Sequence, residues 1–449
     1  MATNRITYGQ SAIAVSQPPG NSDNTKNLTG LKRVQSASID FAFARERFKQ
    51  IGSADYVGQV QVKNADIGLN LDYLYSNGTN EAIMGLNVDG RVETALKYIK
   101  KENQDRNYYI LMGTGENQEP NINSLFKNKF NVMALGNVFL DSYRLSASVG
   151  APVSVSSSLS AYNVVMSQYN DITNGETIPA IDTTKTGPGE PVLDKNYKIT
   201  SSVFQNTSNR DGNIHAAFTA GDIELILSTI NEPGIEFTGS SPVRSATIES
   251  LNVDFGVERT DLYGLGSMYP YGKRAILPLL GNLSFSALAT EFTSGNLNTF
   301  LSGEHNYNFT FNVKDNCSGQ TGLQMVVENA QLDSEGLGEA IGDNATITAT
   351  FGFSMSNVSG LKISTPPLIV NQPVGAAKPA LLSVQATGRT STDTSVYNAD
   401  GFKYQWYSLE PLAAIGANQR TYTASATGNY YVVISNELGE ARSNTANVS

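Results

Sequence analysis

The feature that most constrains this chain is an internal duplication, because two copies of one sequence pattern are expected to fold into two copies of one domain. Residues 39–53 (IDFAFARERFKQIGS) match residues 253–267 (VDFGVERTDLYGLGS) at a constant offset of 214 residues. Residues 137–150 and 329–342, which share Asn, Leu-Asp-Ser and Gly in the same places, match at an offset of 192. The second copy is therefore shorter by 22 residues, and this difference is expected to fall between residues 84 and 130.

Each copy is predicted to begin and end with a β-strand. In the first copy Ile39, Phe41 and Phe43 alternate with small or polar residues, which places them on one face of a strand. The composition agrees, because only 16% of the residues are charged while the chain holds 40 Gly, 21 Tyr and 18 Phe. We predict an all-β protein with a few short helices, at 121–126 or at 220–230. The alternating segments are 36–43, 153–159, 251–257 and 345–353.

A proline-punctuated linker that starts at Thr365 (TPPLIVNQP) ends the duplicated part, and a different domain follows. Residues 368–449 carry the only Trp of the chain, Trp406, and the run GNYYVVIS that contains Tyr430. This segment resembles an immunoglobulin-like (Ig-like) sandwich, in which a buried Trp packs near a tyrosine corner. Val432 stands where antibody domains have a disulfide cysteine, so apolar packing around Trp406 is expected to replace the bridge.

The chain is accordingly divided into four segments. Residues 1–168 are the first copy with an N-terminal arm, and residues 169–243 are a long connection into the second copy. Residues 244–365 are the second copy, and residues 366–449 are the Ig-like domain. The first 30 residues are polar and poor in core residues, so this arm is expected to become ordered only against another subunit.

Few residues are available for catalysis or metal binding. Cys317 is the only cysteine, and His215 and His305 are the only histidines, so one chain cannot build a disulfide framework or a Cys/His zinc site. No catalytic, metal or cofactor site is predicted, and the protein is predicted not to be an enzyme. A hydrolase of cell-wall or capsule sugar is a further hypothesis; it requires paired carboxylates in a cleft, and the sequence alone does not exclude acids that meet only in the fold. The repeated Asp-Ser pairs at 141–142 and 333–334 are interpreted as structural turns.

The charge of the chain restricts its partners. Lys and Arg number 31 against 41 Asp and Glu, which gives a net charge of −10. An acidic protein repels DNA, so a tight complex with DNA is excluded, whereas a conduit through which DNA passes without binding is compatible with this charge. No stretch of the sequence approaches the roughly 20 apolar residues of a membrane helix, and no secretory leader is recognised at Met1, so no membrane insertion is expected.

At this point the motif resembles a known family. A strand followed by Asp-Phe-x-x-x-Arg-x-x-apolar-x-x-apolar-Gly-Ser resembles the major tail tube proteins of long-tailed bacteriophages. Duplication followed by an Ig-like domain resembles the variant in which three subunits imitate a hexameric ring. The resemblance implies a β-sandwich or open barrel per copy, with inner strands that join those of neighbours around a lumen, and an Ig-like domain on the outside.

This resemblance implies a structural virion protein that assembles in the host cytoplasm. Its partners would be itself, as homotrimeric rings stacked into a tube, together with other tail proteins and DNA in transit during ejection. The alternative is an adhesin or tail-tip protein that binds host polysaccharide through its Ig-like domain. In that alternative a glycan stacks, even if weakly, on the aromatic residues Phe402, Tyr404, Trp406 and Tyr430, two of which, Trp406 and Tyr430, are otherwise expected in the Ig-like core.

The repeated motif supplies the candidate assembly residues. An Asp and an Arg five residues apart are interpreted either as partners in ion pairs between subunits or rings, or as an intradomain pair or solvated surface. The Gly-Ser that follows is predicted to turn the chain and is a second candidate contact. These residues are Asp40, Arg45, Gly52 and Ser53 in the first copy and Asp254, Arg259, Gly266 and Ser267 in the second.

Overall fold

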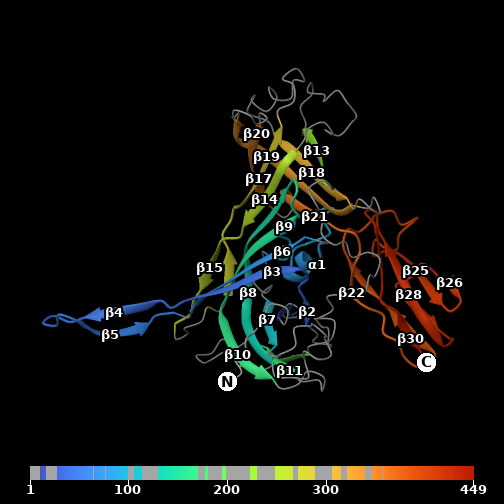
Figure 1. Cartoon of the computed structure of the whole chain (residues 1–449), viewed down its shortest axis with the longest axis horizontal. Coiled ribbons are helices and arrows are strands. Elements are labelled where there is room, and N and C mark those ends of the chain that lie inside the picture. The colour runs from blue at the N-terminus through green and yellow to red at the C-terminus, as the bar shows by residue number, and fades with distance from the viewer. Residues whose placement is uncertain are drawn as a thin grey trace.

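A computed structural model describes most of the chain, and nearly all of its regular structure is antiparallel β-strand (Figure 1). The prediction of an all-β protein is therefore confirmed. The described part contains one helix, α1 (Thr79–Met84). The described residues are 11–16, 28–63, 65–75, 77–99, 106–113, 130–169, 177–180, 195–198, 223–229, 248–265, 270, 272–288, 306–314, 321–338, 346–356 and 358–449.

The first copy is built from two sheets that share the long strand β8 (Phe130–Ser148). The C-terminal half of β8 belongs to an inner sheet and its N-terminal half to an outer sheet. The inner sheet runs β3 (Val34–Ala42), β6 (Asp66–Leu74), β9 (Ser154–Ala161) and β8. The outer sheet contains β2 (Thr29–Gly30), β1 (Ser11–Val15), β7 (Arg106–Gly113), β8 and β10 (Asn163–Tyr169).

The second copy repeats this pairing order, except that β2 has no counterpart among its described strands. Its inner sheet runs β14 (Ile248–Gly256), β17 (Leu279–Leu288), β20 (Thr346–Met355) and β19 (Thr321–Gly338). Its outer sheet contains β13 (Ile223–Thr229), β18 (Tyr307–Lys314), β19 and β21 (Leu361–Ser364). A hairpin follows the first inner strand in each copy, β4 (Arg45–Lys49) with β5 (Tyr56–Gln61) and β15 (Arg259–Leu262) with β16 (Gly272–Ala275).

The irregularities of the sheets recur in the two copies as well. The register between β8 and β9 shifts at Asp141, and the register between β19 and β20 shifts at Asp333. Asn137 and Asn329 both adopt a left-handed backbone, with φ of 53° and 58°. Asn tolerates this conformation better than most residues. Repeated bulges and repeated φ angles show that the duplication extends to the detailed course of the backbone.

Two expectations for the segments that flank the first copy are wrong. The segment 220–230 is not a helix, because residues 223–229 form β13, which pairs with β18. The short apolar run IELILST has no decisive periodicity, and the unpaired edge of β18 determines its conformation. Residues 11–15 of the N-terminal arm are ordered without another subunit, because β1 pairs with β7 and Ala14 is fully buried there.

The remaining helix prediction, at 121–126, lies outside the described residues. The segment predicted as a connection, 169–243, contains β13 and a pair of short strands, β11 (Thr177–Ala180) and β12 (Lys195–Lys198). The outer sheet of the second copy thus includes β13 from this connection. In the same way, the outer sheet of the first copy includes β1 from the N-terminal segment.

A buried polar cluster fixes α1 to the core of the first copy. Glu81 on α1 is only 1% exposed and accepts hydrogen bonds from the hydroxyls of Tyr73 (2.7 Å) and Tyr143 (3.1 Å). Burial raises the pKa of the Glu81 carboxyl above its usual value, although the two hydroxyl donors oppose the shift. The cluster joins α1 to β6 and β8, on which the two tyrosines lie.

The C-terminal domain consists of separate antiparallel sheets around a core of its own. Trp406 is fully buried and donates from Nε1 to the carbonyl of Gln419 (2.9 Å). Tyr430 is 4% exposed, and its hydroxyl donates to the carbonyl of Ala426 (2.9 Å). Val432, directly opposite Trp406, is also fully buried. The strands are β22 (Leu368–Asn371), β23 (Ala380–Ser383), β24 (Gln385–Thr387), β25 (Lys403–Leu409), β26 (Leu412–Ile415), β27 (Thr421–Ala424), β28 (Gly428–Ser435), β29 (Glu440–Arg442) and β30 (Ala446–Val448).

Hydrogen bonds attach this domain to both copies. Thr390 donates from its backbone N–H (3.1 Å) and its hydroxyl (2.9 Å) to the carboxylate of Asp89 in the first copy. Arg389 donates to Gln324 of the outer sheet in the second copy (2.9 Å). In Figure 1 the domain lies on the opposite side of the body from the β4–β5 hairpin.

We predict that the Glu81→Gln variant becomes more stable relative to the native protein as the pH rises. Because the folded pKa of Glu81 is raised, its contribution to stability is fully present below the unfolded pKa and is lost as the pH rises through the folded pKa. Glutamine keeps an acceptor for the two tyrosines and does not ionise. Urea unfolding of both proteins between pH 4 and 8 measures the difference, and a difference that is independent of pH would contradict the prediction.

Candidate assembly interface

The two copies are joined edge to edge by β8 and β14. These strands pair in antiparallel register over seven residue pairs, from Ser148 opposite Ser250 to Ser142 opposite Gly256. The two inner sheets therefore form one continuous sheet of eight strands, in the order β3-β6-β9-β8-β14-β17-β20-β19. In this junction one copy serves as the binding partner of the other.

Apolar side chains bury the core side of this junction. Phe255 on β14 is 2% exposed and stacks on Tyr143 of β8, with ring centroids 5.5 Å apart and planes at 19°. Val257 is 1% exposed, and its backbone N–H donates to the carbonyl of Asp141 (2.6 Å). The backbone ladder thus continues to the bulge in β8.

The main polar contact of the junction is made by Arg259, at the start of the β15–β16 hairpin. Its guanidinium lies 3.2 Å from the carboxylate of Asp141, donates to the carbonyl oxygens of Leu140 and Ile99, and sits over the ring of Phe139. The Arg259 side chain is 3% exposed and that of Asp141 35%. Burial lowers the pKa of Arg259 and the adjacent Asp141 opposes this, but an arginine remains cationic near neutral pH.

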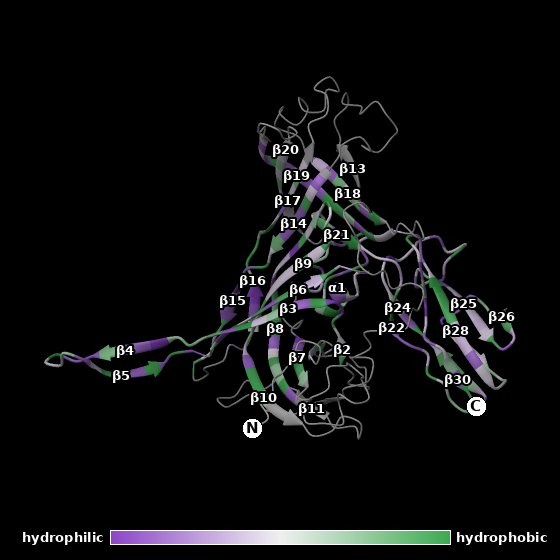
Figure 2. Cartoon of the chain, viewed as in Figure 1, coloured by the Kyte–Doolittle hydropathy of each residue, from purple (hydrophilic) through white to green (hydrophobic). Residues whose placement is uncertain are grey.

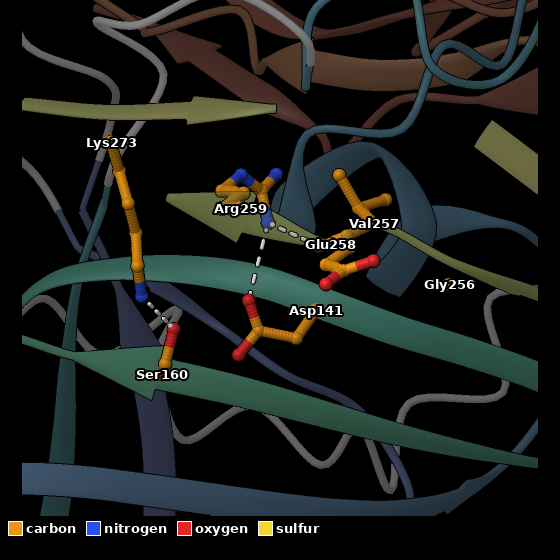
Figure 3. Close-up of a pocket in the computed structure, with 7 residues that line it drawn as sticks. All are labelled: Asp141, Ser160, Gly256, Val257, Glu258, Arg259 and Lys273. Atoms are coloured by element: carbon orange, nitrogen blue, oxygen red, sulfur yellow. Dashed lines mark hydrogen bonds and ion pairs between the residues drawn. The ribbon is translucent and has the colours of Figure 1, made fainter. Parts of the chain in front are cut away.

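A pocket of about 370 Å³ lies beside this ion pair (Figure 3). Lys273 on β16 reaches across it to the hydroxyl of Ser160 (2.5 Å) and packs on the rings of Phe139 and Tyr162. Burial lowers the pKa of the Lys273 ammonium, while Asp141 and Asp261 oppose the shift. The lining residues are Asp141, Ser160, Gly256, Val257, Glu258, Arg259 and Lys273.

A serine hydrogen-bonded to a buried lysine is also the arrangement of some nucleophilic enzymes. Ser160 lies in β9, which is paired on both sides, with Gly68 on β6 and with Phe139 on β8. The backbone N–H groups around it are therefore used in the sheet and do not form an oxyanion site. Lys273 is also 3.8 Å from Asp261, an ion pair that favours the protonated amine. We interpret the pocket as part of the junction between the copies.

The predicted pair of Asp and Arg five residues apart does not form within the second copy. Arg259 binds Asp141 of the first copy, whereas Asp254 accepts a hydrogen bond from Asn282 (3.3 Å). In the first copy Asp40 accepts from Asn70 (3.4 Å). The motif therefore separates into an Asp that remains on its own sheet and an Arg that, in the second copy, crosses to the other copy.

The predicted Gly-Ser turn is at the tip of the β4–β5 hairpin. Gly52 has φ of 90°, a conformation that favours glycine, and the N–H of Ser53 donates to the carbonyl of Gln50 (3.1 Å). The Ser53 hydroxyl donates to the carbonyl of Asp55 (2.9 Å). The equivalent residues Gly266 and Ser267 lie outside the described residues.

The interpretation of the Asp-Ser pairs as turns is wrong. Asp141 and Asp333 are bulge residues inside the long strands β8 and β19. A bulge changes the direction of one side chain without ending the strand, and here it directs Asp141 towards Arg259. The sequence signal for this role of Asp141 is the repetition of Leu-Asp-Ser in both copies. A buried arginine at one end of the repeat needs an acidic partner, and the repeated Asp can supply it.

The same motif that is buried in the second copy is exposed in the first. Phe41 and Phe43 are 41% and 55% exposed, whereas their counterparts Phe255 and Val257 are 2% and 1% exposed. Within the described part of the chain, the guanidinium of Arg45 contacts the ring of Phe43, at 5.7 Å, and forms no ion pair. The β4–β5 hairpin that follows projects away from the body and carries hydrophobic segments (Figures 1 and 2).

No protein-family model matches the chain, and no curated protein matches it significantly. Among the described helices, none has the length and apolarity to cross a membrane. Among the described side chains, no cluster of His, Cys, Asp and Glu is arranged to bind a metal ion.

We predict that Arg259→Met destabilises the protein by about 1–3 kcal/mol, because the carbonyls of Leu140 and Ile99 lose a buried donor and Asp141 loses its ion-pair partner. Arg274→Met, on an exposed position of the same hairpin, is the matched control and should change stability by less than about 0.5 kcal/mol. Urea unfolding measures both variants. Equal effects of the two substitutions would show that Arg259 does not stabilise the junction.

Proposed function

We propose that this protein is the structural subunit of a hollow polymer, the tail tube of a long-tailed bacteriophage, in which stacked rings enclose a lumen for DNA. The observation that carries the proposal is the continuous eight-stranded sheet through both copies. A chain that already joins two copies of a domain edge to edge has the geometry to add further copies in the same way.

The two ends of this sheet support assembly. The described chain offers no strand partner to the outer edge of β3, or to the outer edge of the C-terminal half of β19. Exposed strand edges favour pairing with another chain unless they are blocked. Because the two edges differ, pairing is head to tail and closes into a ring when the rotation allows it. Three chains would place six similar domains around the axis, as the family resemblance implies.

The exposed face of the inner sheet has the chemistry expected of a lumen through which DNA slides. Its residues alternate with the buried core residues and are mostly small hydroxyl side chains. Asp72 accepts hydrogen bonds from Ser36 and Ser156 on the neighbouring strands, both at 2.6 Å. A neutral-to-acidic surface of this kind offers few cations to phosphates. The hydroxyl side chains on this face include Ser36, Ser38, Ser146, Ser154, Ser156, Ser158, Ser250, Ser284, Ser286, Thr348, Thr350 and Ser354.

The C-terminal domain would lie on the outside of the tube. Its attachment through Arg389 and Gln324 is to the outer sheet, because Gln324 pairs with β21. The alternative of a polysaccharide-binding adhesin loses its proposed aromatic platform, because Phe402, Tyr404, Trp406 and Tyr430 are all at most 4% exposed.

The test is negative-stain electron microscopy, with mass determination, of the purified full chain and of the variant Phe41→Lys. We expect hollow tubes or rings from the native chain, and a marked loss of them in Phe41→Lys, because a lysine on a sheet edge opposes pairing. Val358→Lys, at a site 57% exposed and away from both edges, is the control and should assemble normally. A native chain that stays monomeric at every concentration would contradict the proposal.

A further inference from the structure

We infer that β3 of one chain pairs with the C-terminal half of β19 of a second copy of this chain, in the register of β14 on β8, and that Arg45 binds Asp333 across this junction. The inference rests on the proposed function and names the partner strand, the register and the ion pair. The occupant of the exposed β3 edge is therefore a second copy of this chain.

The junction inside the chain serves as the template. The constant offsets make β3 the counterpart of β14 and β19 the counterpart of β8, and each pair carries its bulge at the matching residue. Arg259 corresponds to Arg45 at an offset of 214, and Asp141 corresponds to Asp333 at an offset of 192. Both members of the buried ion pair therefore recur, one at each free edge of the sheet.

The state of these residues in the isolated chain agrees with a missing partner. Among the described residues, neither Arg45 nor Asp333 has an ion-pair partner. Phe41 and Phe43 are exposed where Phe255 and Val257 are buried. A second copy that presented β19 would cover the same atoms that β8 covers inside the chain.

The template also fixes the register. It places Asp40 opposite Gly336 of the second copy, as Asp254 is opposite Arg144. The N–H of Phe43 would donate to the carbonyl of Asp333, as that of Val257 donates to Asp141. No described atom lies within 4 Å of the position of a Cβ on Gly336, so a side chain can be introduced at this position. The full set of opposed pairs is Ser38 with Gly338, Ile39 with Leu337, Asp40 with Gly336, Phe41 with Glu335, and Ala42 with Ser334.

Three replacements make the junction between chains weaker than the one within the chain. Glu335 replaces Tyr143, so Phe41 faces a carboxyl in place of a stacked ring; Glu335 Oε2 is buried without a hydrogen-bond partner among the described residues. Gln59 replaces Lys273, and Gln331 replaces Phe139, so the packing of cations on the ring is lost. The two copies within a chain would therefore stay paired while the contacts between chains form and break.

The decisive experiment is cross-linking of the full-length chain. The variant Asp40→Cys/Gly336→Cys, with Cys317→Ser to remove the only native cysteine, is oxidised during assembly and run on a denaturing, non-reducing gel. We expect covalent dimers and trimers of the chain, because directly opposed residues are within disulfide range. The control Asp40→Cys/Ser334→Cys moves one thiol two residues along the strand, beyond the roughly 7 Å that a disulfide can bridge, and should remain mostly monomeric on the gel.

The ion pair is tested by charge reversal. Arg45→Asp and Asp333→Arg should each raise the concentration at which half of the chains assemble by about tenfold or more, and the double variant should restore much of the loss. Lys49→Asp, on the same exposed hairpin, is the control for charge alone. Glu335→Tyr, which recreates the stacked ring of the internal junction, should lower that concentration.

The outcomes separate the inference from the proposed function. Tubes that form while the in-register cysteines stay uncross-linked, or while only the shifted pair cross-links, would overturn the register but leave a tube subunit. Dimers from Asp40→Cys alone would show that β3 pairs with β3 and would also overturn it. If the double charge reversal fails to restore assembly, the assignment of Arg45 to Asp333 is wrong. A native chain that never assembles would overturn both.

Discussion

The structure of this protein depends on the pairing of β14 with β8. This contact joins the inner sheets of the two copies into one sheet, buries Phe255 and Val257, and aligns Arg259 with Asp141. Without it, each copy would present an edge of unpaired backbone groups and an exposed row of apolar side chains. Another strand satisfies the backbone groups of a buried sheet edge, so the junction decides which surfaces remain for other partners.

The contrast between the two copies has a physical meaning. The shared motif is buried in one copy and exposed in the other, because its burial depends on the presence of a neighbouring strand and not on the motif itself. Segment 86–99 of the first copy adds a further layer to the internal junction. Ala95 donates to the carbonyl of Leu361, and Thr94 donates to that of Ser356 in the second copy. This segment of the first copy thus strengthens the contact between the two copies.

Close approach in this layer depends on a glycine. A Cβ on Gly90 would lie 2.7 Å from the carbonyl oxygen of Ile363, a contact that real side chains do not make. Neighbouring Asp89 accepts the hydrogen bonds from Thr390. One short segment of the first copy therefore reaches both the second copy and the C-terminal domain.

Sequence patterns predicted much of the fold. The alternation around Ile39 and the turn at Gly52 identified local structure, since side-chain period and backbone φ are decided by neighbours in the chain. The run IELILST at 223–229 was assigned to a helix and is a strand, because its conformation is imposed by the edge of β18. Asp141 was assigned to a turn because a bulge leaves no mark on hydrophobic periodicity.

The sequence by itself determined the duplication, the all-β class and the presence of an acid and an arginine in both repeats. Only the tertiary structure decided that Arg259 reaches Asp141 and not Asp254, and that Phe41 remains exposed while Phe255 is buried. The physical reason is that ion pairs and strand pairing between distant segments depend on distances that local sequence does not encode. The repeat therefore defines which groups exist in each copy, and the packing of the copies defines which of them meet.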